Sequence, residues 1–370
     1  MRVKTQLKKI VSFSKGTQIN GDDLIENGKY DYLNGGITPS GKWNQFNTPG
    51  GTVTISEGGN SCGYVNYFRR PFWCGAHCYY LFDPIINTEY LYYMLKSQQD
   101  RLMKIRTGAC MPNIKKGDLG NFELEYDPNI ENQTHVVFIM KRVEAVIAAR
   151  QQQLSALDDL IKARFVEMFG DPETNPKEWE KKPLVDVITI ANNGMARRGN
   201  DADGNIVMRL VELQDGYIDY SNPNRIILTD AEKKRYLLKD KDFLFARVNG
   251  NPENVGRCAV FYDIGEPVFH NDHIIRVHFN DDAIDGSFAS ALLNSEYGKR
   301  QLRNQIKTSA GQYTVSQDGI GAIITILPPI SLQKTFAYFV AQVDNSKATV
   351  QKALDEAQVL FDSLMQQYFG

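Results

Sequence analysis

Hydrophobic residues recur at intervals of seven along two long stretches of the chain, from residue 136 onward and again from residue 336. Such positions share one face of a helix, where a partner helix covers them. A heptad pattern that persists this long predicts coiled-coil packing rather than an ordinary amphipathic surface helix. Each helix would have about 40 residues and a length of ~60 Å. The predicted seam residues are Met140, Val143, Ile147, Leu154, Leu157, Ile161 and Met168 in the first stretch, and Val340, Val343, Val350, Leu354, Phe361 and Leu364 in the second.

Three charged residues, Arg150, Arg164 and Lys347, interrupt this seam. Polar residues at seam positions fix the register or the oligomeric state of a coiled coil at some cost in stability. In the alternative interpretation, their long side chains extend along the edge of the seam and keep the charge in water. The simplest partner for the first helix is the second helix of the same chain. We expect an antiparallel pair with one globular domain at each end.

The second half of the chain repeats the organisation of the first. The segment TGACMPNIKKGDLG at 107–120 returns as TSAGQYTVSQDGIG at 308–321, and each copy leads into one of the long helices. At a spacing of 200 residues the identities include Gln133 and Gln333. A period this long exceeds the roughly 50 residues of a solenoid repeat, so it indicates two whole modules in tandem.

The segments in front of the helices alternate short β-branched or aromatic runs with Gly, Asn and Pro, a pattern that predicts short strands separated by turns. Each segment has a histidine at a corresponding place, His77 or His273, and a helix before the repeated motif. We therefore predict an α+β fold: two tandem α/β domains, each followed by a long helix, with the helices packed as an antiparallel coiled coil with pseudo-twofold symmetry. The predicted parts are domain one at 1–129, the central helix at 130–170, a proline-rich linker at 171–183, domain two at 184–329 and the distal helix at 330–370.

The composition is that of an ordinary globular chain, with 42% hydrophobic and 23% charged residues. The formal net charge is −2, so a basic surface for nucleic acid must be local or shared with a partner subunit. No apolar run reaches the ~18 residues of a membrane span, and the N-terminal residues lack an apolar signal core. We expect a cytoplasmic protein without membrane contacts. Unevenly spaced cysteines fit free thiols in a reducing compartment: Cys62, Cys74, Cys78, Cys110 and Cys258.

Motifs for catalysis are missing from the sequence. It has no GxxxxGK phosphate loop and no GxGxxG, and the SNPN at 221–224 lacks the aromatic residue and second proline of an adenine-methyltransferase-like NPPY. The CGAHC segment at 74–78 does not have the spacing of a structural zinc site, so we expect no metal. His77 and His273 share no neighbouring cysteine or carboxylate arrangement, which favours structural over catalytic histidines. We predict no catalytic residue.

Basic and amide-bearing loops carry the remaining chemistry. Arg reads guanine, and Asn or Gln reads adenine, in the major groove, whereas neighbouring arginines equally suit phosphates. For each residue the alternative is solvated surface charge or, for Asn, turn geometry. The candidates for DNA contact are Lys42, Asn44, Asn60, Asn66, Arg69 and Arg70 in domain one, and Arg197, Arg198, Arg247, Asn249, Asn251 and Arg257 in domain two.

Essentially the whole chain resembles the specificity (S) subunit of type I restriction–modification systems. The resemblance rests on QQQLSALDDLIKARFVEMFGDPETNPKEW at 151–179, which is similar to the central conserved region of that family, and on LPPISLQ at 327–333, which leads into the distal helix. The first copy departs from the second: it has YDPNIENQ at 126–133, with Asn129 in place of the second proline. That difference bears on where the first long helix begins.

The resemblance implies that each globular half is a target recognition domain that reads one part of a bipartite double-stranded DNA site. It also implies that the helices set the spacing between the two parts and bind two methyltransferase (M) subunits, with restriction (R) subunits joining for cleavage. The cofactors would then belong to the partners, S-adenosylmethionine to the methyltransferase and ATP with Mg to the restriction subunit, and this chain would hold none.

Three other interpretations remain open. The first is the specificity chain of a related system with fused methylation and cleavage activities, which neighbouring genes would distinguish. The second is a divergent DNA-acting enzyme that uses His77 and His273, and the third is a structural dimerisation protein built on the coiled coil.

Overall fold

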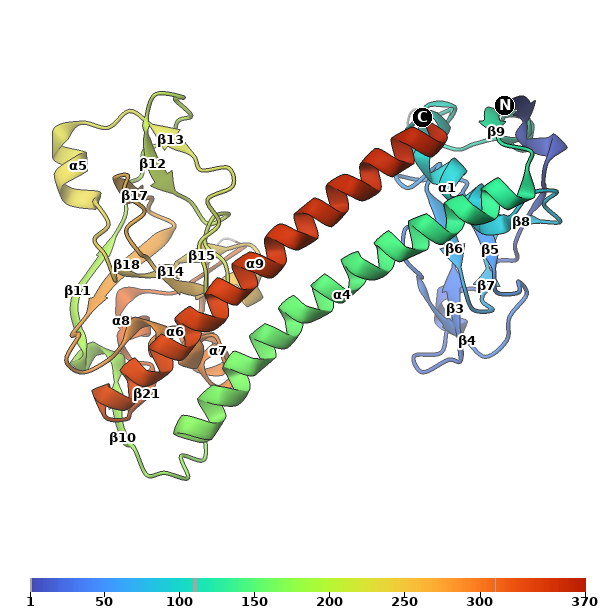
Figure 1. Cartoon of the computed structure of the whole chain (residues 1–370). Coiled ribbons are helices and arrows are strands. Elements are labelled where there is room, and N and C mark those ends of the chain that lie inside the picture. Colours follow the sequence, from blue (N-terminus) through green and yellow to red (C-terminus); the bar gives the residue numbers. More distant parts are fainter. Residues whose placement is uncertain (1, 109–111, 310) are drawn as a thin grey trace. The chain divides into compact units, whose positions relative to one another are not determined.

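The computed structural model describes residues 2–108, 112–309 and 311–370 (Figure 1). The chain divides into two compact units: unit 1 comprises residues 1–152 and 351–370, and unit 2 comprises residues 153–350. The two long helices, α4 (Ile130–Phe169) and α9 (Ile330–Phe369), are both divided between the units. Each unit therefore holds one globular domain, the first part of one long helix and the last part of the other.

The domain of unit 1 is built on two small sheets. The first is antiparallel throughout in the order β2–β8–β5–β6, with strands β2 (Ser12–Lys15), β8 (Cys78–Phe82), β5 (Thr52–Ser56) and β6 (Val65–Phe68). In the second, β3 (Tyr30–Leu33) lies between an antiparallel neighbour, β4 (Gly41–Trp43), and a parallel one, β7 (Trp73–Cys74). Outside these sheets, β1 (Val3–Gln6) pairs with β9 (Glu123–Tyr126).

The domain of unit 2 repeats this topology strand for strand. Its first sheet has the order β11 (Ile188–Asn193), β18 (Ile274–Phe279), β14 (Phe243–Ala246) and β16 (Cys258–Val260). The second has β12 (Asn205–Met208) between β13 (Arg225–Ile226), antiparallel, and β17 (Val268–His270), parallel. The pair β10 (Glu180–Pro183) and β21 (Ile324–Leu327) corresponds to β1 and β9. Unit 2 adds a small sheet of β15 (Val248–Asn249), β20 (Gln312–Thr314) and β19 (Lys307–Ser309).

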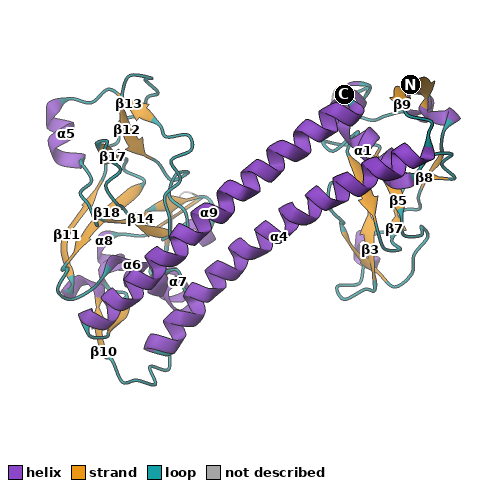
Figure 2. Cartoon of the chain, in the orientation of Figure 1, coloured by secondary structure: helices purple, strands orange, loops and turns teal. Residues whose placement is uncertain are grey.

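Short helices accompany the sheets in both domains (Figure 2). Helix α1 (Thr88–Ser97) packs on β5 and β6, and α6 (Gly286–Leu293) packs on β16. Both helices begin in the same way, because the side chains of Asn87 and Asp285 accept hydrogen bonds from the first backbone N–H groups. The other short helices are α2 (Gln99–Lys104), α3 (Lys116–Gly120), α5 (Asp230–Tyr236), α7 (Glu296–Arg303) and α8 (Gln317–Gly321).

Inside unit 2 the two long helices run antiparallel. Phe336, near the start of α9, packs edge-on against Phe165, near the end of α4, with ring centroids 5.6 Å apart. Further along α9, Lys347 forms an ion pair with Asp158, which lies earlier in α4, at an Nζ–Oδ1 distance of 2.6 Å. The order of contacts is thus reversed between the helices, which confirms the predicted antiparallel pairing.

In unit 1 the roles of the two helices are exchanged. Phe369, near the end of α9, shares a hydrophobic core with Val136 and Met140, near the start of α4. Its ring centroid lies 5.1 Å from that of Tyr90 on α1. Each domain is therefore packed against the start of the helix that follows it and the end of the other long helix.

The predicted seam residues are all at least half-buried, and Met140, Met168 and Val343 are buried. Of the charged residues at the seam, Lys347 pairs across it with Asp158. The guanidinium of Arg164 lies over the Phe339 ring at 5.6 Å and pairs with Glu167 on its own helix at 2.7 Å. Lys347 thus links the helices, Arg164 stays at the seam edge, and Arg150 is half-buried.

The substitution of Asn129 for proline leaves the helix start unchanged, since α4 begins at Ile130 as α9 begins at Ile330. The Asn129 side chain accepts hydrogen bonds from the backbone N–H groups of Glu131 (2.8 Å) and Asn132 (3.2 Å). It therefore caps the helix, where Pro329 supplies a fixed backbone angle in the other copy.

Four of the five cysteines lie within the described residues: Cys62, Cys74, Cys78 and Cys258 are buried and free. Cys110 lies outside the described residues. No helix in the described part of the chain is long and apolar enough to cross a lipid bilayer.

Candidate nucleic-acid interface

The first sheets of the two domains have one equivalent end, where β5 or β14 stops and β8 or β18 starts. Here the backbone N–H of Glu57 donates to the carbonyl of His77 at 2.9 Å, and that of Arg247 donates to the carbonyl of His273 at 2.7 Å. We call this end of each sheet the loop end. Its backbone geometry makes Glu57 equivalent to Arg247, and His77 equivalent to His273.

Further backbone hydrogen bonds fix the same equivalence. The carbonyl of Glu57 accepts from Ile114 N at 2.8 Å, and that of Arg247 accepts from Val315 N at 2.9 Å. Ile114 and Val315 belong to the repeated segment in front of α3 and α8. The two copies of this segment therefore border the loop end in both domains.

The loop that leaves β5 or β14 is closed by a glycine in each domain. Gly63 N donates to Ser56 O at 2.9 Å, and Gly256 N donates to Ala246 O at 2.8 Å. Both glycines have positive φ, 90° and 83°, a region that side chains disfavour. A Cβ at Gly63 would lie 2.8 Å from a backbone nitrogen, so this loop closure requires glycine.

In domain one the loop end carries a carboxylate, that of Glu57, between a lysine and a histidine. The carboxylate of Glu57 pairs with Lys15 at the end of β2, and its other oxygen lies 3.7 Å from Nδ1 of His77. The Glu57 side chain is only 12% exposed, whereas that of His77 is 62% exposed. His77 is therefore a surface group beside a carboxylate, and its backbone carbonyl accepts the hydrogen bond from Glu57 N.

In domain two the same position is cationic. Arg247 donates from Nη1 to the carbonyl of Asp272 at 3.1 Å. The Asp272 carboxylate pairs with Arg198 at 2.7 Å, and the same Arg198 nitrogen lies 3.2 Å from Nε2 of His273. The structure thus brings together two of the predicted arginines, Arg198 and Arg247, around the histidine.

The other predicted contacts of domain one are spread over several places. Asn60 is exposed in the loop between β5 and β6 at the loop end, and Asn66, in β6, donates to Gly36 O at 3.4 Å. Arg69 and Arg70 follow β6 at its opposite end, where Arg69 pairs with Glu144 of α4 at 3.6 Å. Lys42, in β4, and Asn44, whose side chain accepts from Lys29 N at 3.3 Å, belong to the second sheet.

Asn249 and Asn251 form the turn that follows Arg247. Asn249 Oδ1 accepts from Asn251 N at 2.9 Å, and Asn251 Oδ1 accepts from Glu253 N at 3.1 Å. Arg197 is held by the carbonyl of Ile227 and the carboxylate of Glu232, at 2.9 and 3.1 Å. These side chains therefore serve local structure in addition to any contact with a ligand.

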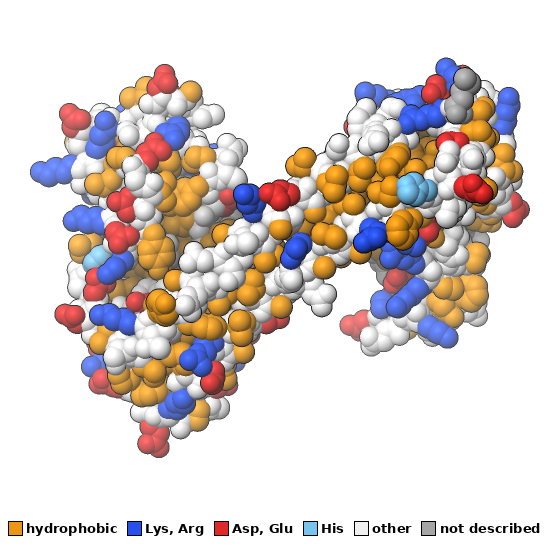
Figure 3. Space-filling view, viewed as in Figure 1, with side chains coloured by type: hydrophobic (Ala, Val, Ile, Leu, Met, Phe, Trp, Pro, Cys, Tyr) orange, Lys and Arg blue, Asp and Glu red, His pale blue; other side chains and the backbone are white. Residues whose placement is uncertain are grey.

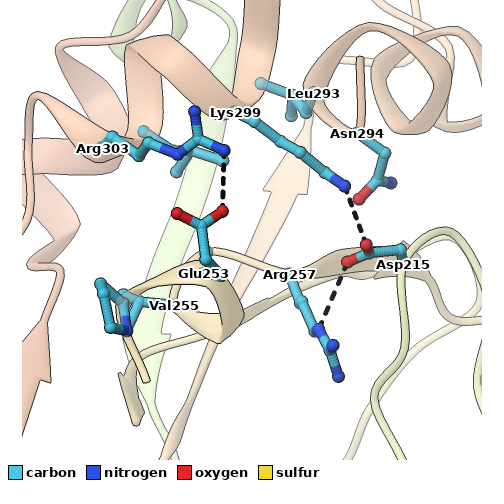
Figure 4. A pocket seen from close by; sticks show the side chains of 11 residues that line it. Asp215, Glu253, Val255, Arg257, Leu293, Asn294, Lys299 and Arg303 are labelled. Carbon is cyan, nitrogen blue, oxygen red and sulfur yellow. Dashed lines mark hydrogen bonds and ion pairs between the residues drawn. The ribbon is translucent and has the colours of Figure 1, made fainter. Parts of the chain in front are cut away.

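The side chain of Arg257 belongs to a network of ion pairs (Figure 4). Its Nε lies 3.5 Å from Asp215, which also accepts from Lys299 of α7 at 2.9 Å. Beside it, Arg303 pairs with Glu253 at 2.7 Å. The hollow between these side chains measures about 10 Å³, which accommodates about one water molecule and no base.

The sequence alone did not single out Lys15, Glu57 or Asp272. The repeated long helices keep a constant spacing of 200 residues. Glu57 and Arg247 are separated by a different spacing, since the loops of the two domains differ in length. The sequence signal that could have identified Glu57 and Arg247 as equivalent is their position directly after equivalent strands, β5 and β14. Strand-by-strand alignment would have paired them.

Domain two also contains a buried histidine, His270, which is the last residue of strand β17. His270 Nδ1 lies 3.1 Å from the carbonyl of Tyr236, and burial lowers the pKa of the imidazole to about 4, with the charge of Arg276 acting in the same direction. This histidine is neutral at physiological pH. Within residues 2–108, 112–309 and 311–370, no three His, Cys, Asp or Glu side chains are grouped so that they would hold a metal ion.

Comparison with known proteins places this geometry in context. A family model described as the type I restriction modification DNA specificity domain matches residues 3–158 and 176–358, well over half of the chain. The specificity subunit of the type I restriction enzyme StySPI from Salmonella potsdam is 27% identical over 92% of this chain and 78% of its own length. That of EcoKI from Escherichia coli K12 is 23% identical with the same coverage.

Two solved structures share the fold. The crystal structure of a type I restriction–modification S subunit from Mycoplasma genitalium has a TM-score of 0.64 and 20% identity, covering 100% of this chain and 96% of its own. A chain from a study of complex assembly and conformational transition in a type I system has a TM-score of 0.56 and 12% identity, covering 100% and 97%.

Proposed function

This chain belongs to the type I restriction–modification DNA specificity family, and we propose that it reads a bipartite DNA site, with one half-site for each globular domain. The observation that carries this proposal is the loop end: the same backbone framework presents Glu57 in one domain and Arg247 in the other. A shared framework with different side chains suits two domains that dock on DNA alike and select different bases.

We infer that this chain has no catalytic activity of its own. Methylation, with S-adenosylmethionine, belongs to M subunits, and cleavage, with ATP and Mg, belongs to R subunits. The net charge of −2 agrees with this division, because partner subunits then supply part of the positive surface that encloses the DNA.

The long helices offer surfaces for two copies of one partner. Phe138 and Tyr338, 200 residues apart, are 55% and 68% exposed near the starts of α4 and α9. Leu160 and Leu360, toward the ends of the helices, form a second exposed pair with the same spacing. Hydrophobic side chains are visible along both helices in Figure 3. Equivalent apolar surfaces in units 1 and 2 favour two M subunits, one for each unit.

The test is to express the chain with its methyltransferase partner in a host without adenine methylation and to map the methylated adenines. We expect one bipartite motif with an unspecified spacer. Replacement of residues 1–129 by another recognition domain should change one half of the motif and leave the other intact. Methylation by the purified chain alone, or a motif with one continuous half-site, would contradict the proposal.

A further inference from the structure

We propose that Glu57 and Arg247 are equivalent specificity-determining residues that select a G·C base pair in opposite orientations. This inference rests on the proposed function, because it assigns bases within the two half-sites. Arg247 would read guanine, and Glu57 would read the cytosine of a pair presented the other way round.

The two side chains start from the same place. Each follows the same strand of the first sheet, donates its N–H to the equivalent histidine carbonyl, and accepts at its own carbonyl from the repeated segment. The histidine itself is common to both domains and cannot distinguish the half-sites. One difference at the loop end therefore lies at residue 57 and residue 247, which share a backbone position and have opposite charges.

Both groups are held in place before any ligand binds. The Glu57 carboxylate is anchored by Lys15, and Arg247 is anchored through Nη1 by the carbonyl of Asp272. A group that is already ordered loses less entropy on binding, so more of its interaction energy contributes to affinity.

The chemistry of each group selects one base edge. In the major groove, guanine presents two acceptors, O6 and N7, which match the donors of an arginine. Cytosine presents its N4 amino group as a donor, which matches a carboxylate acceptor. Because cytosine is the partner of guanine, a carboxylate and a guanidinium at one docking position select the same base pair in two orientations.

A purely structural account of Glu57 is that its ion pair with Lys15 stabilises domain one. Two variants separate the accounts. Glu57→Gln keeps the shape of the side chain but gives it an amide, which reads adenine. Lys15→Met removes the ion pair and keeps the carboxylate. If the ion pair alone matters, both variants lower thermal stability alike and neither changes the sequence that is read.

The experiment maps methylated sites for the wild-type chain, Arg247→Ala and Glu57→Gln, each in complex with the methyltransferase partner. Arg247→Ala should relax a single position of one half-site, with a loss of discrimination of about 10- to 100-fold. Glu57→Gln should change a single position of the other half-site from cytosine toward adenine. The unchanged half-site in the same complex shows that the protein is folded and docked.

Matched controls are Arg303→Ala, an exposed arginine of α7, and Glu125→Gln, an exposed glutamate of β9. Both should leave the motif intact. The inference is overturned if Arg247→Ala or Glu57→Gln lowers methylation equally at all positions, or leaves the motif unchanged, or if the two affected base pairs have the same orientation. A wild-type complex that methylates no bipartite motif would instead overturn the proposed function.

Discussion

Gln333 accepts a hydrogen bond from the backbone N–H of Asp285 at 2.9 Å, and through it the start of helix α9 is tied to the N-cap of helix α6. Its amide donates to the carbonyl of Pro328 at 2.7 Å. Gln133 does the same in unit 1, accepting from Asn87 N at 2.8 Å and donating to Asp127 O at 2.7 Å. Both glutamines are buried, so these bonds are shielded from water.

Replacement of Gln333 by Leu should therefore destabilise unit 2. The substitution leaves buried backbone groups without partners, and each costs about 1–3 kcal/mol. We expect a loss of about 2–4 kcal/mol in the free energy of unfolding, measured by urea denaturation. Gln342→Leu, at an exposed position of the same helix, is the control and should change stability by less than about 0.5 kcal/mol. Equal effects of the two substitutions would contradict the role assigned to Gln333.

The stability of unit 2 should fall as the pH is lowered from about 6.5 toward 4. Burial lowers the pKa of His270 to about 4, whereas an unfolded histidine titrates near 6.5. Over this range the unfolded state binds a proton that the folded state does not bind, so protonation favours unfolding. The expected loss between pH 7 and pH 5 is about 2 kcal/mol from this residue.

His270→Gln should remove that part of the pH dependence. The measurement is urea denaturation at pH 7 and pH 5, followed by a signal from unit 2. An identical pH dependence in the variant and the wild-type chain would show that His270 is not responsible.

Insertion of one heptad into each long helix should lengthen the spacer between the half-sites. Asp158 and Lys347 face one another across the seam, so insertions beside them keep the two helices in register. Seven residues add about 10 Å to a helix, which corresponds to roughly three base pairs. Mapping of the methylated motif measures the spacer. An insertion into α4 alone is the comparison, because it misaligns the seam and should abolish methylation. A longer helix pair with an unchanged spacer would reject the idea that the helices act as a ruler.

Tyr338→Ser should reduce the number of bound methyltransferase subunits from two to one. The exposed ring lies in unit 2, and its counterpart Phe138 lies in unit 1, so each substitution removes apolar surface from one unit only. Light scattering of the purified complex gives its mass and hence its composition. The double variant Phe138→Ser with Tyr338→Ser should bind neither copy, and retention of two copies by that variant would place the partner surface elsewhere.

The duplication could be predicted from sequence because its physical signature is local. A heptad repeat in the sequence is a direct consequence of helix packing. Residues such as Gln133 and Gln333 remain 200 residues apart because the elements around them have kept their lengths. The antiparallel pairing could be predicted as well. Each long helix follows an equivalent domain of the same chain, and antiparallel packing is the simplest way for two such helices to pair.

The candidate interface could be predicted only in part. Arg198 and Arg247 do lie together, but Arg257 turns to Asp215, Arg69 to Glu144 and Arg197 to Glu232. A charged residue in a loop looks alike in sequence whether it faces a ligand or an internal partner. Which of the two it faces depends on a contact with a residue distant in the chain.

The order of residues alone thus determined the family, the tandem modules, the long helices and their seams, because each rests on periodicity or on residues close together in the chain. Only the tertiary structure decided that Glu57 and Arg247 occupy one position, that His77 lies beside a carboxylate, and that the end of each long helix packs against the other domain. Those relations depend on hydrogen bonds and packing between distant segments. The loops between those segments differ in length, so no constant spacing in the sequence records them.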